Sequence, residues 1–380
     1  MTFFLNQAAK HKALFIMVLG LCVATALQAQ VSADSLPERR GPVDSFPHDP
    51  KYYRTYSGFL AGRVFLSRRY NNLRMSDNDN QQPSFRYTPN SPINLGIGAT
   101  YNWLTINLGF AFKFLNPGRE DQGETKSIDF QSFIYGRRAI LDLFAQFYKG
   151  FYIDPSQLQG ATSPYIKADL RTGQLGFGYL YMTNWKRFSA RAAMLQSERQ
   201  LKSAGTWLIG LNSTYVAAKS DSTMLPEMPG FEKLPSLRRV KSFEIGPSFG
   251  YAYNYVFLKR FFAMGMLTGH LNLNYAKEYT NEGQNTRWTL GPNLSYKFAM
   301  GYSKPNWSAA ITWTEYWPNF RTNNYSFLAR NGIFRVSWVY RFVPGPKIQR
   351  AFKPIDDIYQ KSYERYKRLA AKLKPSSILK

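Results

Sequence analysis

Histidine, the side chain whose charge most readily changes near neutral pH, is scarce in this sequence. The chain has three histidines, at positions 11, 48 and 270. His270 lies in "GHLNLNY", and Asn272 follows two residues later, on the same face if the segment is a strand. A histidine could activate a serine there for attack on a lipid ester, but no serine lies beside the pair. We therefore interpret His270 as a polar group of an interior wall.

Metal and cofactor chemistry find little support in the sequence. Three scattered histidines do not form a zinc cluster. Asp77 and Asp79 in "SDNDNQQ" could bind a divalent cation, although a solvated loop explains them better. The chain has no phosphate-binding loop, nucleophile elbow or dinucleotide motif. We expect no metal and no cofactor, and we lean against an enzyme.

Charged residues within alternating segments are the remaining candidates for a site. Side chains two apart share one face of a strand, so alternation sorts these charges by face. The polar face holds Arg63, Lys113, Asp129, Asp142, Arg191, Glu244, His270, Lys297, Arg335 and Arg341. They would either form an internal salt-bridge network that stiffens a narrow barrel or line a basic constriction that favours anions.

The elements that would position these charges are strands. In "INLGIGATYNWLTINLGFAF", residues 93–112, apolar residues occupy every second position and the phase changes at Leu104. This pattern predicts two strands joined by a tight hairpin near residues 102–104. Similar alternation recurs in thirteen segments, which are 59–75, 92–102, 104–114, 126–136, 138–149, 171–183, 187–197, 204–218, 240–255, 261–276, 285–301, 305–316 and 326–342.

The two faces of these segments differ in a way that favours a membrane. One face is rich in Phe, Tyr and Trp, and the other in Gly, Asn, Ser and Thr. A soluble barrel would enclose the aromatic face and leave an outer surface poor in Lys and Glu, whereas a membrane barrel turns the aromatic face to lipid. The sequence therefore predicts an all-β, antiparallel transmembrane β-barrel. Because such barrels normally have an even strand number, we expect about 12 strands, with 14 as the alternative. A large secreted soluble β protein is the competing interpretation.

Aromatic residues near the strand ends are typical of the girdles that lie at membrane interfaces. The residues expected in this role are Tyr52, Tyr53, Tyr56, Trp103, Trp185, Trp307, Tyr316 and Trp317.

The two ends of the chain predict its compartment. Lys10 and Lys12 precede the apolar run "ALFIMVLGLCVATAL", and Ala29 ends a small-residue site, so residues 1–29 are expected to be a signal peptide. Residues 30–57 are expected to be a periplasmic linker, 58–342 the barrel, and 343–380 a basic periplasmic tail with a short amphipathic helix near 355–373. A signal peptide followed by a transmembrane barrel predicts that the protein is located in the bacterial outer membrane. The net charge of +25 then suits lipopolysaccharide or other anionic lipid, and we expect no nucleic acid.

The last alternating segment resembles the C-terminal strand signal read by the barrel assembly machinery. In "RVSWVYRF", residues 335–342, Arg335, Tyr340 and Phe342 match that signal, and Ser337 stands where glycine is usual. We expect this strand to close the barrel against the first strand, near residues 59–67.

Three segments carry a family resemblance. "RYTPNSPINLGIGATYNWLTINLGFAFKFLNP", "DLFAQFYKGFYI" and "SERQLKSAGTWLIG" resemble the bacterial family called domain of unknown function 4421, over roughly residues 50–342. The resemblance implies an outer-membrane β-barrel and brings no activity with it.

Three functions are compatible with these features. We place a structural or interaction role in the cell envelope first, with a periplasmic partner of the tail as one form of it. A passive pore with a basic lumen is the alternative, and a lipid-modifying enzyme that uses His270 is the least favoured.

Overall fold

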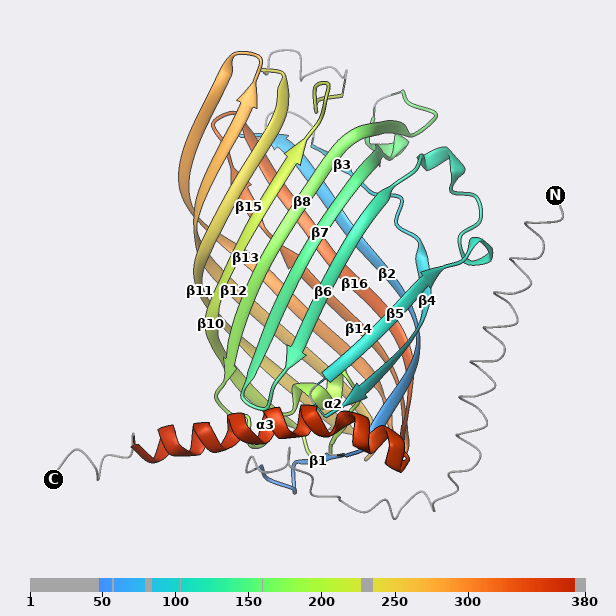
Figure 1. The fold of residues 1–380 in the computed structure, drawn as a ribbon. Coiled ribbons are helices and arrows are strands. Elements are labelled where there is room, and N and C mark those ends of the chain that lie inside the picture. The colour runs from blue at the N-terminus through green and yellow to red at the C-terminus, as the bar shows by residue number, and fades with distance from the viewer. Residues whose placement is uncertain are drawn as a thin grey trace.

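The alternating segments form twelve long strands, which join in one antiparallel sheet that curls into a barrel (Figure 1). The computed structural model describes residues 48–372 except 57, 79–83, 103, 159 and 227–234. Around the barrel the strand order is β5, β4, β2, β16, β14, β13, β12, β11, β10, β8, β7 and β6. Their bounds are β2 Leu60–Asp77, β4 Ile93–Tyr101, β5 Leu104–Ala111, β6 Lys126–Tyr135, β7 Ala139–Ile153, β8 Tyr165–Met182, β10 Ala204–Lys219, β11 Leu237–Phe257, β12 Phe261–Thr280, β13 Gly283–Ser303, β14 Trp307–Trp317 and β16 Tyr325–Phe342. The predicted all-β barrel and the smaller strand number are confirmed.

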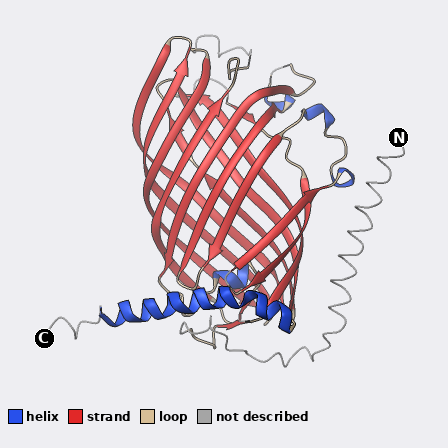
Figure 2. Ribbon diagram, in the orientation of Figure 1, coloured by secondary structure: helices blue, strands red, loops and turns tan. Residues whose placement is uncertain are grey.

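Short elements lie at the two ends of the barrel and beside its wall (Figure 2). They are the strands β1 Tyr53–Thr55, β3 Phe85–Tyr87, β9 Glu198–Gln200 and β15 Asn319–Arg321, the 3-10 helices η2 Lys113–Leu115, η3 Glu120–Gln122 and η4 Pro155–Gln157, and the helices α2 Ala190–Met194 and α3 Pro346–Lys372. We call the end near α3 the helix end and the opposite one the loop end. β1 falls at the end of the segment expected to be a linker.

One of the thirteen predicted strands is wrong. Segment 187–197 contains α2 rather than a strand. Ser189 caps this helix by accepting a hydrogen bond from the Ala192 N–H, and Ala and Met favour the helical backbone that follows. Removing this segment leaves the twelve strands that the barrel has.

The predicted closing strand is confirmed by the strand register. β16 pairs with β2 along its whole length, with Phe342 opposite Leu60 and Arg335 opposite Ser67. The remaining neighbours pair in turn around the barrel, except β5 and β6, which end the order without pairing with each other. These two strands diverge from the helix end toward the loop end (Figure 1). The barrel wall therefore has a gap on one side.

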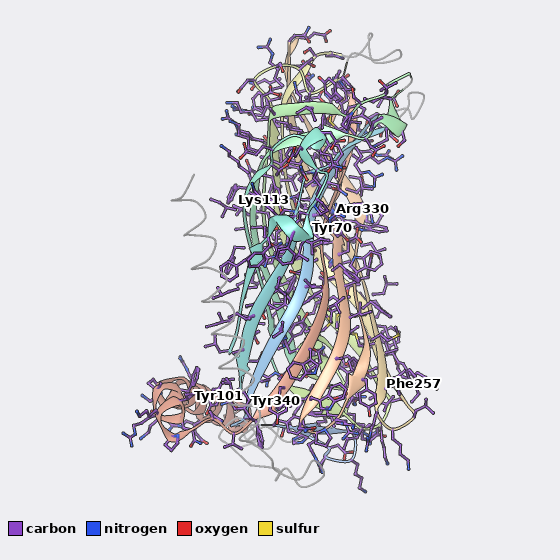
Figure 3. The ribbon with its side chains drawn as sticks, turned by 90° about the vertical axis from the view of Figure 1, so that its right-hand side faces the viewer. Tyr70, Tyr101, Lys113, Phe257, Arg330 and Tyr340 are labelled. Atoms are coloured by element: carbon purple, nitrogen blue, oxygen red, sulfur yellow. The ribbon has the colours of Figure 1, made fainter. Side chains whose placement is uncertain are left out.

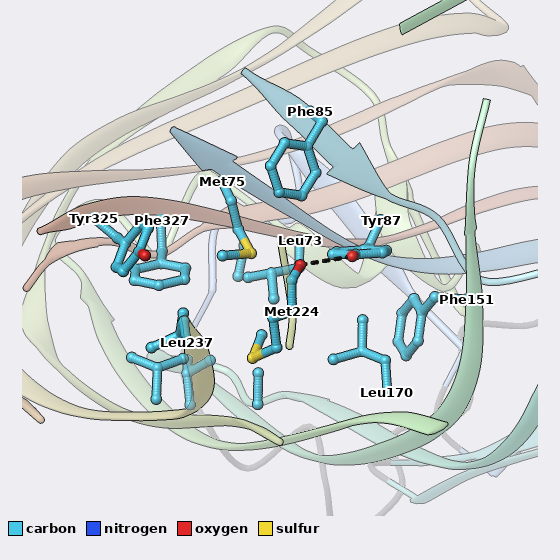
Figure 4. Packing of buried hydrophobic residues seen from close by; sticks show 14 of the residues in the cluster. Leu73, Met75, Phe85, Tyr87, Phe151, Leu170, Met224, Leu237, Tyr325 and Phe327 are labelled. Atoms are coloured by element: carbon cyan, nitrogen blue, oxygen red, sulfur yellow. Dashed lines mark hydrogen bonds between the residues drawn. The ribbon is translucent and has the colours of Figure 1, made fainter. Parts of the chain in front are cut away.

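Apolar clusters fill the interior at both ends of the barrel. At the helix end, residues 183–203, which we call the plug, contribute Trp185, Phe188 and Met194 to a cluster with inward side chains of the wall. At the loop end, Tyr87 and Met224 pack among residues of β2, β16 and the loops, and the Tyr87 hydroxyl donates to the Met224 carbonyl at 2.7 Å (Figure 4). The described part of the lumen is therefore occupied at both ends.

The outer face of the barrel is apolar, as the alternation predicts. Phe110, Trp288 and Leu290 expose 55%, 63% and 67% of their surface, values that are unusual for a protein surrounded by water.

Four of the expected girdle residues are placed wrongly by the prediction, and Trp103 lies outside the described residues. Trp185 is buried in the plug cluster, and Tyr316 lies in the lumen, where its hydroxyl contacts Glu244. Tyr53 and Tyr56 are buried beneath the barrel. Both precede β2, and the β1–β9 pairing draws this segment against the plug.

The C-terminal helix begins earlier than expected. α3 starts at Pro346, the last residue of the sequence Pro344-Gly345-Pro346, and not near residue 355. Proline suits the first turn of a helix because its missing N–H would have no partner there. The helix lies across the helix end of the barrel, close to Tyr101 (Figure 3). The Phe352 ring stacks on the Tyr101 ring with centroids 4.5 Å apart. Among the described residues, no helix is both long enough and apolar enough to cross a membrane.

The closing register makes a prediction about truncation. A chain that ends after Phe342 keeps the complete β2–β16 ladder, whereas one that ends after Val339 loses the last three pairs, opposite residues 60–62. We expect the first chain to refold into detergent micelles and the second to fail, as judged by the mobility of unheated samples on a gel. Equal folding of both chains would contradict closure at this seam.

Candidate functional site

A network of polar side chains crosses the middle of the lumen. The Tyr316 hydroxyl donates to Glu244 Oε1 at 2.7 Å, and Asn293 Nδ2 donates to Glu244 Oε2 at 2.7 Å. Asn212 Nδ2 donates to the Tyr316 hydroxyl at 2.8 Å, which links β10 to the far side of the barrel. Glu244 is thus buried with partners for both carboxylate oxygens. Its burial is compatible with a structural role, because buried carboxylates are tolerated when hydrogen-bonded.

His270 lies beside two serines, which the sequence did not indicate. Its Nδ1 is 2.7 Å from Ser248 Oγ, and its Nε2 is 2.9 Å from Ser295 Oγ. Ser248 lies opposite His270 on β11, so the expectation that no serine neighbours the histidine is wrong. Both ring nitrogens are engaged by hydroxyl groups, and no described carboxylate hydrogen-bonds the ring to orient it as in a catalytic triad. The geometry favours a buried structural histidine.

A buried ion pair bridges the lumen between distant strands. Lys297 Nζ on β13 lies 2.6 Å from Asp142 Oδ1 on β7, and four strands separate these two in the sheet. The ammonium group also lies 4.6 Å from the centre of the Phe133 ring. Lys297 is buried. This contact fills the space that an axial channel would need at that level.

Inward arginines hold the plug in place. Arg63 Nη2 donates to the Leu195 carbonyl, Arg341 Nε donates to the Gln196 carbonyl at 2.7 Å, and Arg191 Nε donates to the Tyr135 carbonyl. Arg191 belongs to α2 and not to a strand, but its side chain still lies inside the barrel. These three predicted lumen charges therefore connect the wall and the plug.

Glu198 is the acidic partner within this assembly. Arg137 Nη1 lies 2.9 Å from Glu198 Oε1, and Arg191 Nη1 lies 3.5 Å from the same oxygen. Burial by itself would raise the pKa of Glu198, but the two guanidinium groups and the Ser189 hydroxyl lower it below its ordinary value. Glu198 and Arg137 lie outside the alternating segments, so the alternation of side chains does not point to them.

A cavity of about 570 Å³, which we call the side chamber, lies against the gap between β5 and β6. Its inner wall includes the polar residues Gln131 and Thr314. Its rim includes Ile106, Leu108 and Phe130, whose outward side chains are more than half exposed. The side chamber therefore joins a polar interior to the apolar outer face through the wall.

Two arginines lie on the inner wall of the side chamber. Arg69 reaches β6, where its Nη1 donates to the Asp129 carbonyl at 2.6 Å and lies 3.5 Å from Asp129 Oδ1. Arg335 lies 4.8 Å from the centre of the Phe65 ring, and its Nε is buried without a hydrogen-bond partner. No carboxylate of the described residues forms an ion pair with Arg335. Arg335 is thus a cation with unused hydrogen-bonding capacity that faces the chamber.

The remaining predicted residues fall in different places. Lys113 is wrong as a lumen charge, because β5 ends at Ala111 and Lys113 is exposed in η2 (Figure 3). In the proposed assembly signal, Ser337 faces inward with Arg335, while the rings of Tyr340 and Phe342 stack along the outer face. Asp77 is buried, and Asp79 and the expected signal peptide lie outside the described residues. The described residues include no group of three or more potential metal ligands among His, Cys, Asp and Glu.

The Glu198 cluster makes a prediction about acid. Because its folded pKa is depressed, its contribution to stability is complete above the unfolded pKa of about 4.3 and is lost as the pH falls through the folded pKa. We expect Glu198→Gln to lower the free energy of unfolding by about 3–5 kcal/mol at pH 7, since it removes the carboxylate that compensates two buried guanidinium groups. The difference from the unmodified protein should shrink below pH 4 in urea unfolding followed by tryptophan fluorescence. An undiminished difference at low pH would contradict this assignment.

Comparison with known proteins adds a family and a class of fold. Among curated proteins, none matches this chain. The chain is similar to neisserial surface protein A at 10% identity and a TM-score of 0.21, covering 75% of this chain and 98% of that one. It is similar to the outer-membrane expressed OmpT of Vibrio cholerae at 8% identity and a TM-score of 0.26, covering 78% and 99%. At this level of similarity, no function of these two proteins can be assigned to this chain. The model of one family, described as domain of unknown function (DUF4421), matches residues 43–342, and the chain therefore belongs to that family.

Proposed function

We propose that this protein is a bacterial outer-membrane β-barrel that takes an amphiphile from the surrounding membrane into the side chamber. The exposed apolar outer face supports a membrane location, because a surface of this composition is suited to hydrocarbon. The expected signal peptide supports export to the envelope. The axial ends are packed, which supports entry from the side.

The unpaired edges of β5 and β6 are the observation that carries this proposal. Each backbone N–H or C=O without a partner in hydrocarbon costs several kcal/mol, so a membrane barrel normally closes completely. An open edge is tolerated where the backbone faces water or polar groups. The side chamber supplies that environment, and a ligand that exchanges with its water would use the same opening.

The chamber has the polarity that an amphiphile requires. An acidic head group would meet Arg335, whose guanidinium has donors to spare. Arg69 also lies on the inner wall of the side chamber, but its guanidinium forms an ion pair with Asp129. The apolar part would remain at the rim, against Leu108 and Phe130. This arrangement favours ligand uptake over a purely structural role.

The other interpretations are less well supported by the geometry. A passive axial pore would need space that the Lys297–Asp142 pair and the plug occupy. A lipid-modifying enzyme would need an accessible His270, whereas its ring is buried and both nitrogens are engaged.

The partners expected at the helix end remain proposals. β16 presents Tyr340 and Phe342 outward at its end, as recognition by the barrel assembly machinery would require. α3 places the exposed cations Lys361, Arg365 and Arg368 outside the barrel, where they could contact anionic head groups or a periplasmic partner.

A titration of the full chain in uncharged maltoside micelles tests ligand uptake. With Cys22 replaced by Ala, an environment-sensitive fluorophore on Gln131→Cys reports on the chamber, and the same label on Thr286→Cys reports on the exposed surface. We expect dodecyl phosphate or dodecanoate to produce a saturable change at position 131 alone, and dodecanol to bind about tenfold more weakly, because a charge-assisted hydrogen bond contributes roughly 1.5–3 kcal/mol.

Matched variants separate recognition from folding. Arg335→Gln should weaken binding of the acid by about tenfold, and Arg335→Lys should retain most of it. Arg287→Gln, which removes a cation outside the chamber, should have no effect. A change that never saturates, or that is equal at both labelled positions, would contradict uptake into the chamber.

A further inference from the structure

Five cations form a continuous row across five neighbouring strands. Lys126 on β6 lies opposite Lys149 on β7, and Lys149 lies opposite Arg171 on β8. Arg171 lies opposite Lys219 on β10, which in turn lies opposite Arg239 on β11. We call these residues the cation row. Each member is a direct cross-strand neighbour of the next.

The cation row faces outward. Four of its members are exposed and Arg239 is half-buried. The residues next to them in sequence, such as Tyr148, Ala218 and Val240, point inward and are buried. Successive residues of a strand point to opposite faces, so the charges lie together on the outer surface.

Such a row is unfavourable unless something compensates it. Like charges directly opposite each other destabilise a sheet, and here four consecutive pairs are like-charged. Within the described residues, Arg171 pairs with Asp221 at 3.3 Å and Lys126 lies 3.9 Å from Glu124, both at exposed positions. Lys149, Lys219 and Arg239 form no ion pair with any of the described residues. The row therefore keeps a net positive charge.

The place of the row on the barrel indicates what compensates it. Toward the helix end, the next outward residues of β6 and β7 are Ile128 and Phe147, which are exposed apolar side chains. Toward the loop end, β6 and β10 end at the row, β11 continues for two residues, and β7 and β8 continue for four and six residues before the connections begin. The row thus lies at the border of the apolar outer face that is nearer the loop end. If the apolar outer face spans the hydrocarbon of the membrane, the head groups of the outer leaflet lie at this border.

We infer that the cation row binds the phosphate groups of lipopolysaccharide in the surrounding leaflet. Basic side chains suit phosphate oxygens, and five of them in register present a line of positive charge to a layer of anions. Lys241 and Lys277 form a further opposed pair beside the row, which extends the basic surface along β11 and β12. This inference depends on the membrane orientation of the proposed function and not on the side chamber.

The test compares three variants of the full chain for binding of fluorescent lipopolysaccharide in maltoside micelles. The row variant carries Lys149→Gln, Arg171→Gln and Lys219→Gln. A control with Lys186→Gln, Lys259→Gln and Lys361→Gln removes the same charge from exposed positions at the helix end. A third variant, with Lys149→Arg, Arg171→Lys and Lys219→Arg, keeps the charge of the row. All three should show the heat-modifiable mobility of a folded barrel.

We expect the row variant to bind about 100-fold more weakly, since each basic residue near an anionic surface contributes roughly fivefold. The charge-keeping variant and the helix-end control should bind lipopolysaccharide within about twofold of the affinity of the unmodified protein. Dephosphorylated lipid A lacks the phosphate groups, so its affinity for the unmodified protein should be as low as the affinity of lipopolysaccharide for the row variant. Equal weakening in the row variant and the control, or unchanged binding of dephosphorylated lipid, would overturn the inference. The row variant should retain the fluorescence response of the side chamber, which separates a failure here from a failure of ligand uptake.

Discussion

The structure depends on one constraint, which is that the backbone of a strand in apolar surroundings must have hydrogen-bond partners. The twelve-strand order meets this constraint by antiparallel pairing at every join except one. β16 returns to β2 with an unbroken register from Phe342 opposite Leu60 to Tyr325 opposite Asp77. Against that background the gap between β5 and β6 is the exceptional feature, and the polar side chamber lies where the constraint would otherwise be violated.

The interior explains why the barrel can carry a gap in its wall without an open axis. Contacts such as Lys297–Asp142 and Asn212–Tyr316 connect strands on opposite sides and tie the wall together through the lumen. At the helix end, Arg63 and Arg341 fasten the plug through its backbone carbonyls. Because both axial ends are packed, we propose that the molecule meets other molecules at its side, through the chamber and the cation row.

Local patterns predicted the strands well because each face meets a uniform environment. The alternation in residues 93–112 predicted the β4–β5 hairpin, and the pattern near Phe342 predicted the closing strand. Segment 187–197 was misassigned because its apolar residues were interpreted as alternating, although Ser189 followed by Ala-rich sequence is a helix start. The position of Arg69 follows from the same alternation as Arg63 and could have been predicted. The serines around His270 and the missing β5–β6 pairing involve consecutive strands, yet alternation did not predict them, because it assigns each side chain to a face without fixing the register or the pairing between strands.

Hydrogen exchange of backbone amides in the reconstituted protein tests the central claim most directly. If β5 and β6 are unpaired edges beside a water-filled chamber, their amides should exchange much faster than those of β11 and β12, whose neighbours pair on both sides. Addition of a chamber-binding amphiphile such as dodecyl phosphate should slow exchange in β5 and β6 selectively. Protection of β5 and β6 equal to that of β11 and β12 without any ligand would show that the wall is closed and would contradict the account.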